Sequence, residues 1–127
     1  MQELNRYEFA VVRFVPRVER EEFVNVGLAM MCKRKRWLKV EIKLPEELLH
    51  VFAPGFDLTL LKKQLQALTD IAAGSGSAGP VALYPVEERF RWISAVKSSV
   101  IQTSRPHPGL CADLEETFDR LFSELVS

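Results

Sequence analysis

The first group of residues that could do chemistry lies near the start of the chain, where Arg13, Glu22 and Asn25 interrupt two apolar stretches. A buried guanidinium needs carboxylate or carbonyl partners, and a buried asparagine needs hydrogen-bond partners. Gly27 follows, and a glycine weakens a strand unless it forms a bulge or lets another backbone or a ligand come close. The group fits either an anion- or substrate-binding corner or a structural clamp that fixes a hairpin, and we favour the clamp.

A second polar group lies in the sequence KSSVIQTSRPH. Its members Lys97, Ser98, Gln102 and His107 include the cations and hydroxyls that suit a phosphate or a carboxylate. His107 could act as a general base, although a lone histidine between Arg105 and a proline is more often a plain surface residue. The spacing matches neither a P-loop nor a Gly-x-Ser-x-Gly nucleophile elbow, so it predicts no particular reaction.

A basic strip begins with the four consecutive residues Lys33, Arg34, Lys35 and Arg36 and continues on the open face of the strand predicted after them, with Trp37, Lys39 and Lys43. Basic side chains next to an aromatic residue such as Trp37 can bind RNA or single-stranded DNA through phosphates and stacking. The alternative is a set of solvated charges that guards an exposed edge strand. Because the chain has 17 basic and 17 acidic residues and no net charge, we favour the second interpretation and expect no nucleic-acid partner.

Metal and redox chemistry have little support in the sequence. The chain has two histidines and two cysteines, Cys32 and Cys111, with no CxxC or Cys/His spacing. We expect no metal site and no cofactor. Reduced structural thiols are the favoured interpretation of both cysteines, over a disulfide, metal or redox role.

The elements that would position these residues begin with three strands. Phe23–Cys32 is apolar on both faces and is predicted to be the central strand, because alternate residues of a strand point to opposite faces. Tyr7–Val15 is β-branched and aromatic and stops at Pro16. Trp37–Leu44 alternates between apolar and polar residues, as a half-exposed strand does. Together these segments predict an antiparallel meander.

Helical spacing follows the meander. Pro45 suits the start of a short helix, and Asp57 is the expected N-cap of a longer helix that ends near Gly74. Asp113 with Glu116 three positions later predicts a capping box for the last helix. Between them we expect a weak helix over Val86–Val96, a strand over Ser99–Thr103 and a turn over Ser104–Gly109.

The order of these elements predicts one α+β domain over residues 1–127, with an antiparallel sheet of about four strands and helices packed on it. The two central strands are apolar on both faces, so both faces should be covered. We expect helices on one face, and on the other face either more helix, a loop or a second copy of the protein. A homodimer is therefore one hypothesis. The longest apolar run is far shorter than the ~18 residues of a membrane span. We therefore expect a soluble, cytoplasmic protein without membrane contact.

Two stretches, YEFAVVRFVP with EEFVNVGLAMMC and RFRWISAVKSSVIQTSRPHPGLCAD with ETFDRLFSELV, resemble a bacterial family catalogued as a domain of unknown function, number 3037. The positions that carry the resemblance are Arg13, Glu22, Asn25, Val26, Gly27, Arg91, Trp92, Ser98, Gln102, His107, Gly109 and Asp113. An arginine is common in this family where the chain has Lys97. The resemblance implies a small intracellular bacterial protein whose relatives often lie beside genes for kinase-like enzymes, and it implies no reaction.

We therefore expect a non-catalytic accessory or interaction protein, with a kinase-like enzyme as one candidate partner. The alternative is a small enzyme or ligand-binding domain for a phosphate-containing or nucleic-acid substrate. That alternative requires the Arg13 group and the Gln102 group to meet in one pocket. A third hypothesis, nucleic-acid binding through the basic strip, predicts affinity that falls steeply with salt.

Overall fold

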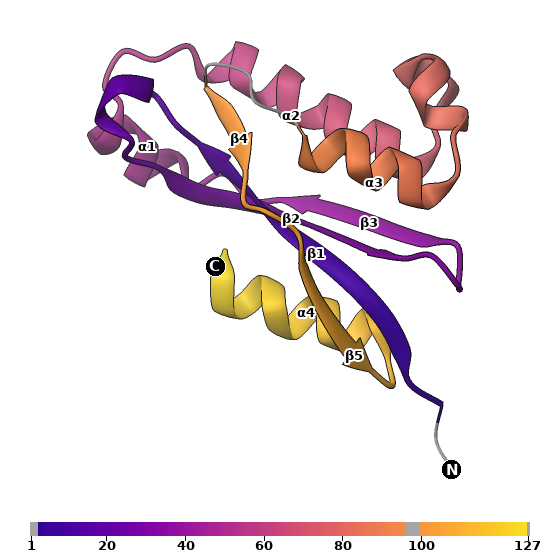
Figure 1. Ribbon diagram of the computed structural model, residues 1–127. Helices are drawn as coiled ribbons and strands as arrows, with labels where there is room; N and C mark the ends of the chain where they lie inside the picture. Colours follow the sequence, from indigo (N-terminus) through magenta and orange to yellow (C-terminus); the bar gives the residue numbers. More distant parts are fainter. Residues whose placement is uncertain (1–2, 96–99, 127) are drawn as a thin grey trace.

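The computed structural model describes residues 3–95 and 100–126, and it contains one antiparallel sheet with helices on both of its faces (Figure 1). The strand order is β3-β2-β1-β4, and β5 also pairs with β1. The predicted α+β class is confirmed. The strands are β1 (Asn5–Phe14), β2 (Val24–Cys32), β3 (Trp37–Ile42), β4 (Ile101–Thr103) and β5 (His107–Cys111), and the α-helices are α1 (Glu46–Phe52), α2 (Leu58–Ala73), α3 (Val86–Ser94) and α4 (Leu114–Leu125).

Strands β1 and β2 form the centre of the sheet, and a bulge interrupts their pairing. Val12 lies opposite Gly27, but the next residue, Arg13, lies opposite Asn25, so β2 carries one additional residue, Val26, at this point. A β-carbon on Gly27 would lie 2.5 Å from Ile42 Cδ1 and 2.9 Å from the Glu41 carbonyl oxygen. The glycine therefore permits β3 to approach β2 closely beside the bulge.

The other edge of β1 is shared by β4 and β5. Arg13 lies opposite Gln102 in β4, and Phe9 lies opposite His107 in β5. The predicted turn over Ser104–Gly109 is wrong from His107 onward, because HPGLC pairs with β1 as a fifth strand. Pro108 is tolerated there because an edge strand can point a residue without an N–H group toward solvent.

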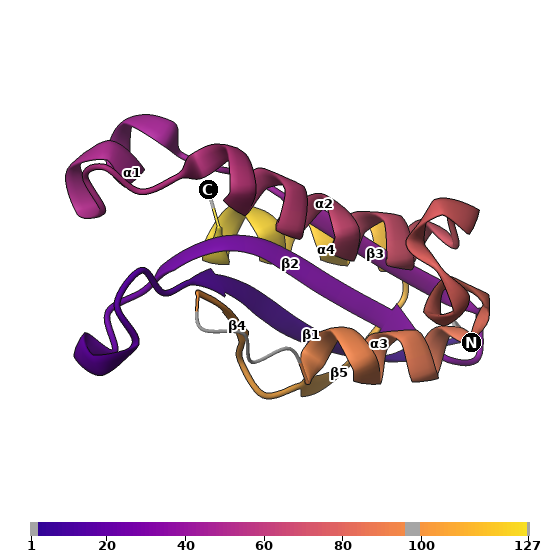
Figure 2. The same cartoon turned by 90° about the horizontal axis from the view of Figure 1, so that it is seen from above.

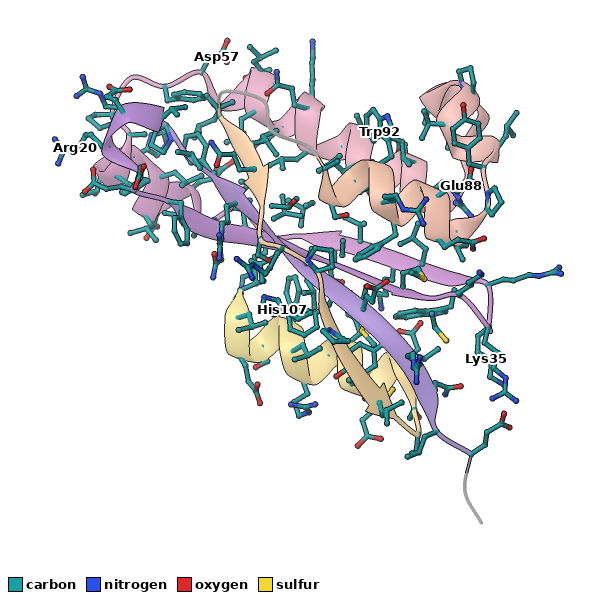
Figure 3. All side chains as sticks on the ribbon, viewed as in Figure 1. Arg20, Lys35, Asp57, Glu88, Trp92 and His107 are labelled. Carbon is teal, nitrogen blue, oxygen red and sulfur yellow. The ribbon has the colours of Figure 1, made fainter. Side chains whose placement is uncertain are left out.

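The helix ends follow the capping residues that the sequence predicted. The Asp57 carboxylate accepts hydrogen bonds from the backbone N–H groups of Thr59 and Leu60, and Gly74 ends α2 with a φ of 72°. The Asp113 carboxylate accepts from the backbone N–H of Glu116 at the start of α4. In α3, which ends two residues before the predicted boundary, the exposed Trp92 lies on the outer side of the helix (Figure 3).

Each face of the sheet has its own core. Helices α2 and α3 lie side by side over one face (Figures 1 and 2), with buried residues such as Val12, Phe14, Leu65 and Ile93 between the layers. Helix α4 covers the other face, where Phe118 packs with Leu28, Met30 and Val11. The second face of the central strands is thus covered by the chain's own last helix, one of the three coverings that the sequence allowed. Among the described residues, no helix combines the length and apolar character needed to cross a bilayer.

Candidate functional site

Three of the predicted site residues form a row across neighbouring strands. Asn25 in β2 and Gln102 in β4 both lie opposite Arg13 in β1. Residues opposite each other in antiparallel strands point to the same face, with β-carbons about 5 Å apart. The Asn25 side-chain amide donates to the carbonyl of Leu125 at a distance of 3.0 Å. The row therefore lies on the α4 side of the sheet, at the C-terminal end of that helix.

Arg13 is stacked on an aromatic ring. Its guanidinium carbon lies 4.2 Å from the centre of the Phe23 ring, and the Phe23 side chain is about half exposed, at 46%. Arg13 Nε and Asn25 Oδ1 are both buried and have no hydrogen-bond partner in the described structure. The unpaired donor and the unpaired acceptor thus belong to residues that lie opposite each other in β1 and β2. Buried polar atoms nearly always find partners, and a group from another molecule reaches these two only if the surrounding side chains move.

Glu22 and Gly27 do not join this row. The Glu22 carboxylate accepts a hydrogen bond from Arg20, and that bond holds the pKa of Glu22 below its usual value. Both side chains are exposed in the loop before β2. Gly27 lies opposite Val12, on the face that α2 and α3 cover. The predicted cluster of Arg13, Glu22 and Asn25 is therefore reduced to a pair, and Gly27 serves packing.

His107 lies on the same face as the row but farther along β1. Its ring centre is 5.2 Å from that of Phe9, which packs against the α4 core. Phe9 and Arg13 are four residues apart in one strand, which corresponds to about 13 Å. His107 thus lies beside the row without being part of it. Lys97 and Ser98 are outside the described residues.

Helix α4 contacts part of the basic strip and leaves the turn before β3 exposed. Lys33–Arg36 forms the exposed turn between β2 and β3, and Arg34 in this turn pairs with Glu3. The strip was expected to continue on the open face of β3, but α4 lies against this face at Trp37 and Lys39, and only Lys43 stays exposed. Lys39 Nζ lies 2.8 Å from a Glu115 carboxylate oxygen and 4.7 Å from the centre of the Phe118 ring.

Glu115 also accepts a hydrogen bond from the Trp37 indole at 3.3 Å. The bond from Lys39 is the main cause of a lowered pKa at Glu115, and the same bond raises the pKa of Lys39. The two β3 side chains that would have bound nucleic acid are therefore occupied by contacts with α4.

The sequence did not single out Phe23 as a site residue. It was assigned to the central strand because Phe23–Cys32 is apolar on both faces apart from Asn25, whereas the structure starts β2 at Val24 and leaves Phe23 half exposed. An aromatic residue at a strand end, two positions before a polar residue, was the signal that could have identified it.

Metal and thiol chemistry have no visible centre in the described part of the chain. Among residues 3–95 and 100–126, no three His, Cys, Asp or Glu side chains are grouped in a way that could hold a metal ion. Cys32 is buried, Cys111 is half-buried, and both are free.

The fold and the row define an α+β domain in which a half-buried arginine stacks on an exposed aromatic ring at one end of the sheet. A model of the family described as "protein of unknown function (DUF3037)" matches residues 9–126, so the chain belongs to this family. This confirms the resemblance seen in the sequence, and the match includes the whole row, β5 and α4. No curated protein and no solved structure matches the chain.

Proposed function

We propose that the protein is a non-catalytic accessory protein that binds a protein partner through a contact surface made of Arg13, Phe23, Asn25 and Gln102. The observation that carries the proposal is the stacking of the Arg13 guanidinium on the half-exposed Phe23 ring, in line with two side-chain amides. Arginine and aromatic residues are enriched among the residues that supply most of the binding energy at protein interfaces.

The chemistry of the contact surface indicates what a partner must present. The guanidinium has several N–H donors in one plane and suits a carboxylate or a backbone carbonyl. Asn25 Oδ1 is buried, so it is not a direct contact atom of this surface. A partner segment that offers a carboxylate or a carbonyl to Arg13, with an apolar side chain to cover Phe23, would fit this surface.

A hollow next to the loop between β1 and β2 would extend the interface around the end of the sheet, because Phe56 in its lining contacts Phe14 on the face that α2 and α3 cover. It has a volume of about 740 Å³ and is lined by the loop residues Pro16, Arg17, Arg20 and Glu22 and by residues 51–56. Val51 at its edge is 81% exposed, and Val18 in the loop is 46% exposed. Exposed apolar side chains close to a hollow are typical of protein interaction sites.

A kinase-like enzyme is the partner to test first, because the family resemblance implies such neighbours. We further propose a bacterial protein that works in the cytoplasm. A homodimer is a separate proposal, which light scattering at tens of micromolar concentration tests directly: a monomer under these conditions would count against it.

The test compares variants of the contact surface with a matched surface control. Phe23→Ser and Arg13→Lys remove the aromatic ring and the planar guanidinium, whereas Leu110→Ser changes an apolar residue of β5 that is 61% exposed. Binding to the kinase-like enzyme, measured by isothermal titration, is expected to weaken at least about tenfold for the first two variants and to be unchanged for Leu110→Ser. Circular dichroism confirms that each variant is folded. Equal affinities for all four proteins, or no binding by the unchanged protein, would refute the proposal for this partner.

A ligand-binding domain or small enzyme for a phosphate-containing substrate is the second candidate. The observation that favours it is the direct pairing of Arg13 with Gln102, since both polar groups were required to meet at one site. Titration with phosphate esters would then shift the amide resonances of these two residues, and this shift would be lost in Gln102→Ala.

A further inference from the structure

A second hollow, lined by none of the residues of the contact surface, lies between α3 and the sheet. It has a volume of about 700 Å³, which is in the range of about 300–1,000 Å³ usual for small-ligand sites. Strand β1 supplies Arg6 and Glu8, the β2–β3 turn supplies Lys33, and α3 supplies Glu87 and Arg91. We call it the α3 hollow.

The α3 hollow concentrates positive charge in a chain whose net charge is zero. Four basic side chains line it, and an adjoining hollow of about 530 Å³ shares Lys33 and Glu87 with it and adds Arg36 and Arg89. Six of the 17 basic residues thus lie along the two hollows, together with only two of the 17 acidic residues. Neighbouring charges of one sign raise the local potential and attract an ion of the opposite sign.

Of the four cations that line the α3 hollow, three are free to bind a ligand. Arg89 of the adjoining hollow already has hydrogen-bond partners, because its Nε donates to the Tyr84 carbonyl and its Nη1 to two carbonyls at the end of α2. Arg34 pairs with Glu3. In the described part of the chain, Arg6, Lys33 and Arg91 make no ion pair, and all three are exposed.

The other lining residues restrict the kinds of ligand that the α3 hollow can bind. An organic skeleton can pack against the part of the wall formed by Tyr7, Met31 and Pro108. Guanidinium groups suit the paired oxygens of a phosphate or carboxylate. Glu8 and Glu87 accept hydrogen bonds from hydroxyl groups and disfavour a densely charged polyanion.

We propose that the α3 hollow binds a small organic ligand that carries an oxyanion, either a phosphate or a carboxylate, together with hydroxyl groups. The oxyanion lies among Arg6, Lys33 and Arg91, and the hydroxyls face the two glutamates. This site uses none of the residues of the contact surface.

The test is a titration of the full chain at low salt, followed by amide nitrogen–proton correlation spectra, with AMP as the phosphate probe and gluconate as the carboxylate probe. We expect saturable shifts for residues 6, 33 and 91 with one of the two, which identifies the type of oxyanion. Arg91→Ala and Arg6→Gln change exposed side chains and should each weaken binding at least about tenfold.

The matched control is Arg120→Ala, which removes an exposed arginine from α4 that pairs with Glu124. It should leave the affinity unchanged, as should Phe23→Ser in the contact surface. The proposal is overturned if neither probe gives saturable shifts, or if Arg120→Ala weakens binding as much as Arg91→Ala does. Because Phe23→Ser affects only the protein contact, failure of this proposal is distinguishable from failure of the proposed function.

Discussion

Replacing Gly27 with alanine should destabilise the protein, although the backbone at this position can accept a side chain. The added β-carbon would lie 2.5 Å from Ile42 Cδ1, 2.9 Å from the Glu41 carbonyl oxygen and 3.3 Å from Val12 Cβ. The Ile42 methyl can rotate away, but the carbonyl belongs to the paired strand β3 and cannot move without disturbing the sheet. Overpacking of this kind costs about 1–3 kcal/mol.

Part of that cost is offset in the unfolded state. Alanine restricts the unfolded chain more than glycine does, which favours the folded state by about 0.4–1 kcal/mol where the backbone is compatible. We therefore expect a net loss of about 1–2 kcal/mol in the free energy of unfolding. Urea denaturation monitored by circular dichroism measures this loss from the shift in midpoint at constant slope.

The control and a rescue variant test the cause. Gly76→Ala adds a β-carbon with no atom within 4 Å, so the free energy of unfolding should stay within about 0.5 kcal/mol or rise slightly. Ile42→Val removes the nearest contact and should recover part of the loss when combined with Gly27→Ala, which a double-mutant cycle reports as a coupling energy. If Gly27→Ala is as stable as the unchanged protein, the close approach of β3 is not the reason for the glycine.

Two further predictions concern the docking of α4. The pKa of Glu115 is lowered by its bond from Lys39, so its stabilising effect is complete above the pKa of the unfolded chain and is lost as pH falls through the lower folded value. The difference in unfolding free energy between the protein and Glu115→Gln should therefore shrink as the pH falls from about 7 to about 3. It should stay below about 1 kcal/mol at every pH, because the side chain is exposed. A difference that grows on acidification would contradict this. Phe118 is fully buried at the centre of the α4 core, so Phe118→Ala should lower the free energy of unfolding by about 3–5 kcal/mol in thermal or urea unfolding. The loss should be clearly smaller for Phe122→Ala, because Phe122 is only half-buried. Equal losses would show that α4 does not dock through Phe118.

Local signals in the sequence predicted the parts of the fold that local chemistry determines. The β1–β2 hairpin follows from two apolar runs on either side of a charged loop, and the N-caps at Asp57 and Asp113 follow from side chains that bond to the next turn of their own helices. Strand β5 was missed because HPGLC contains a proline and a glycine and shows no alternation. It is held by pairing with β1, and the Tyr7 ring covers Gly109, with Tyr7 Cε1 2.9 Å from the position of a β-carbon there.

The candidate site was predicted only in part, because some of its contacts are local in the sequence and others are not. Arg13 and Asn25 belong to one hairpin, so their proximity could be anticipated, but the bulge that sets them opposite each other has no reliable sequence signal apart from Gly27. The partner of Glu22 could not be anticipated, because the sequence alone does not choose between Arg13 and Arg20. The basic lining of the α3 hollow was also hidden, since Arg6 and Arg91 lie 85 positions apart in the chain.

The dependence of the sheet on its last strands affects how the chain can fold during synthesis. Asn5 lies opposite Cys111, and the Asn5 amide donates to the Ala112 carbonyl, 107 positions later. At synthesis rates of about 5–20 residues per second, the α4 side of the β1–β2 hairpin would stay uncovered for about 5–20 s after β2 is complete. During this interval Leu28 and Met30, which are fully buried in the finished protein, face solvent. A nascent chain that stalls before β4 should therefore bind chaperones or aggregate, whereas release of residues 101–125 closes the sheet and covers its second face at nearly the same time.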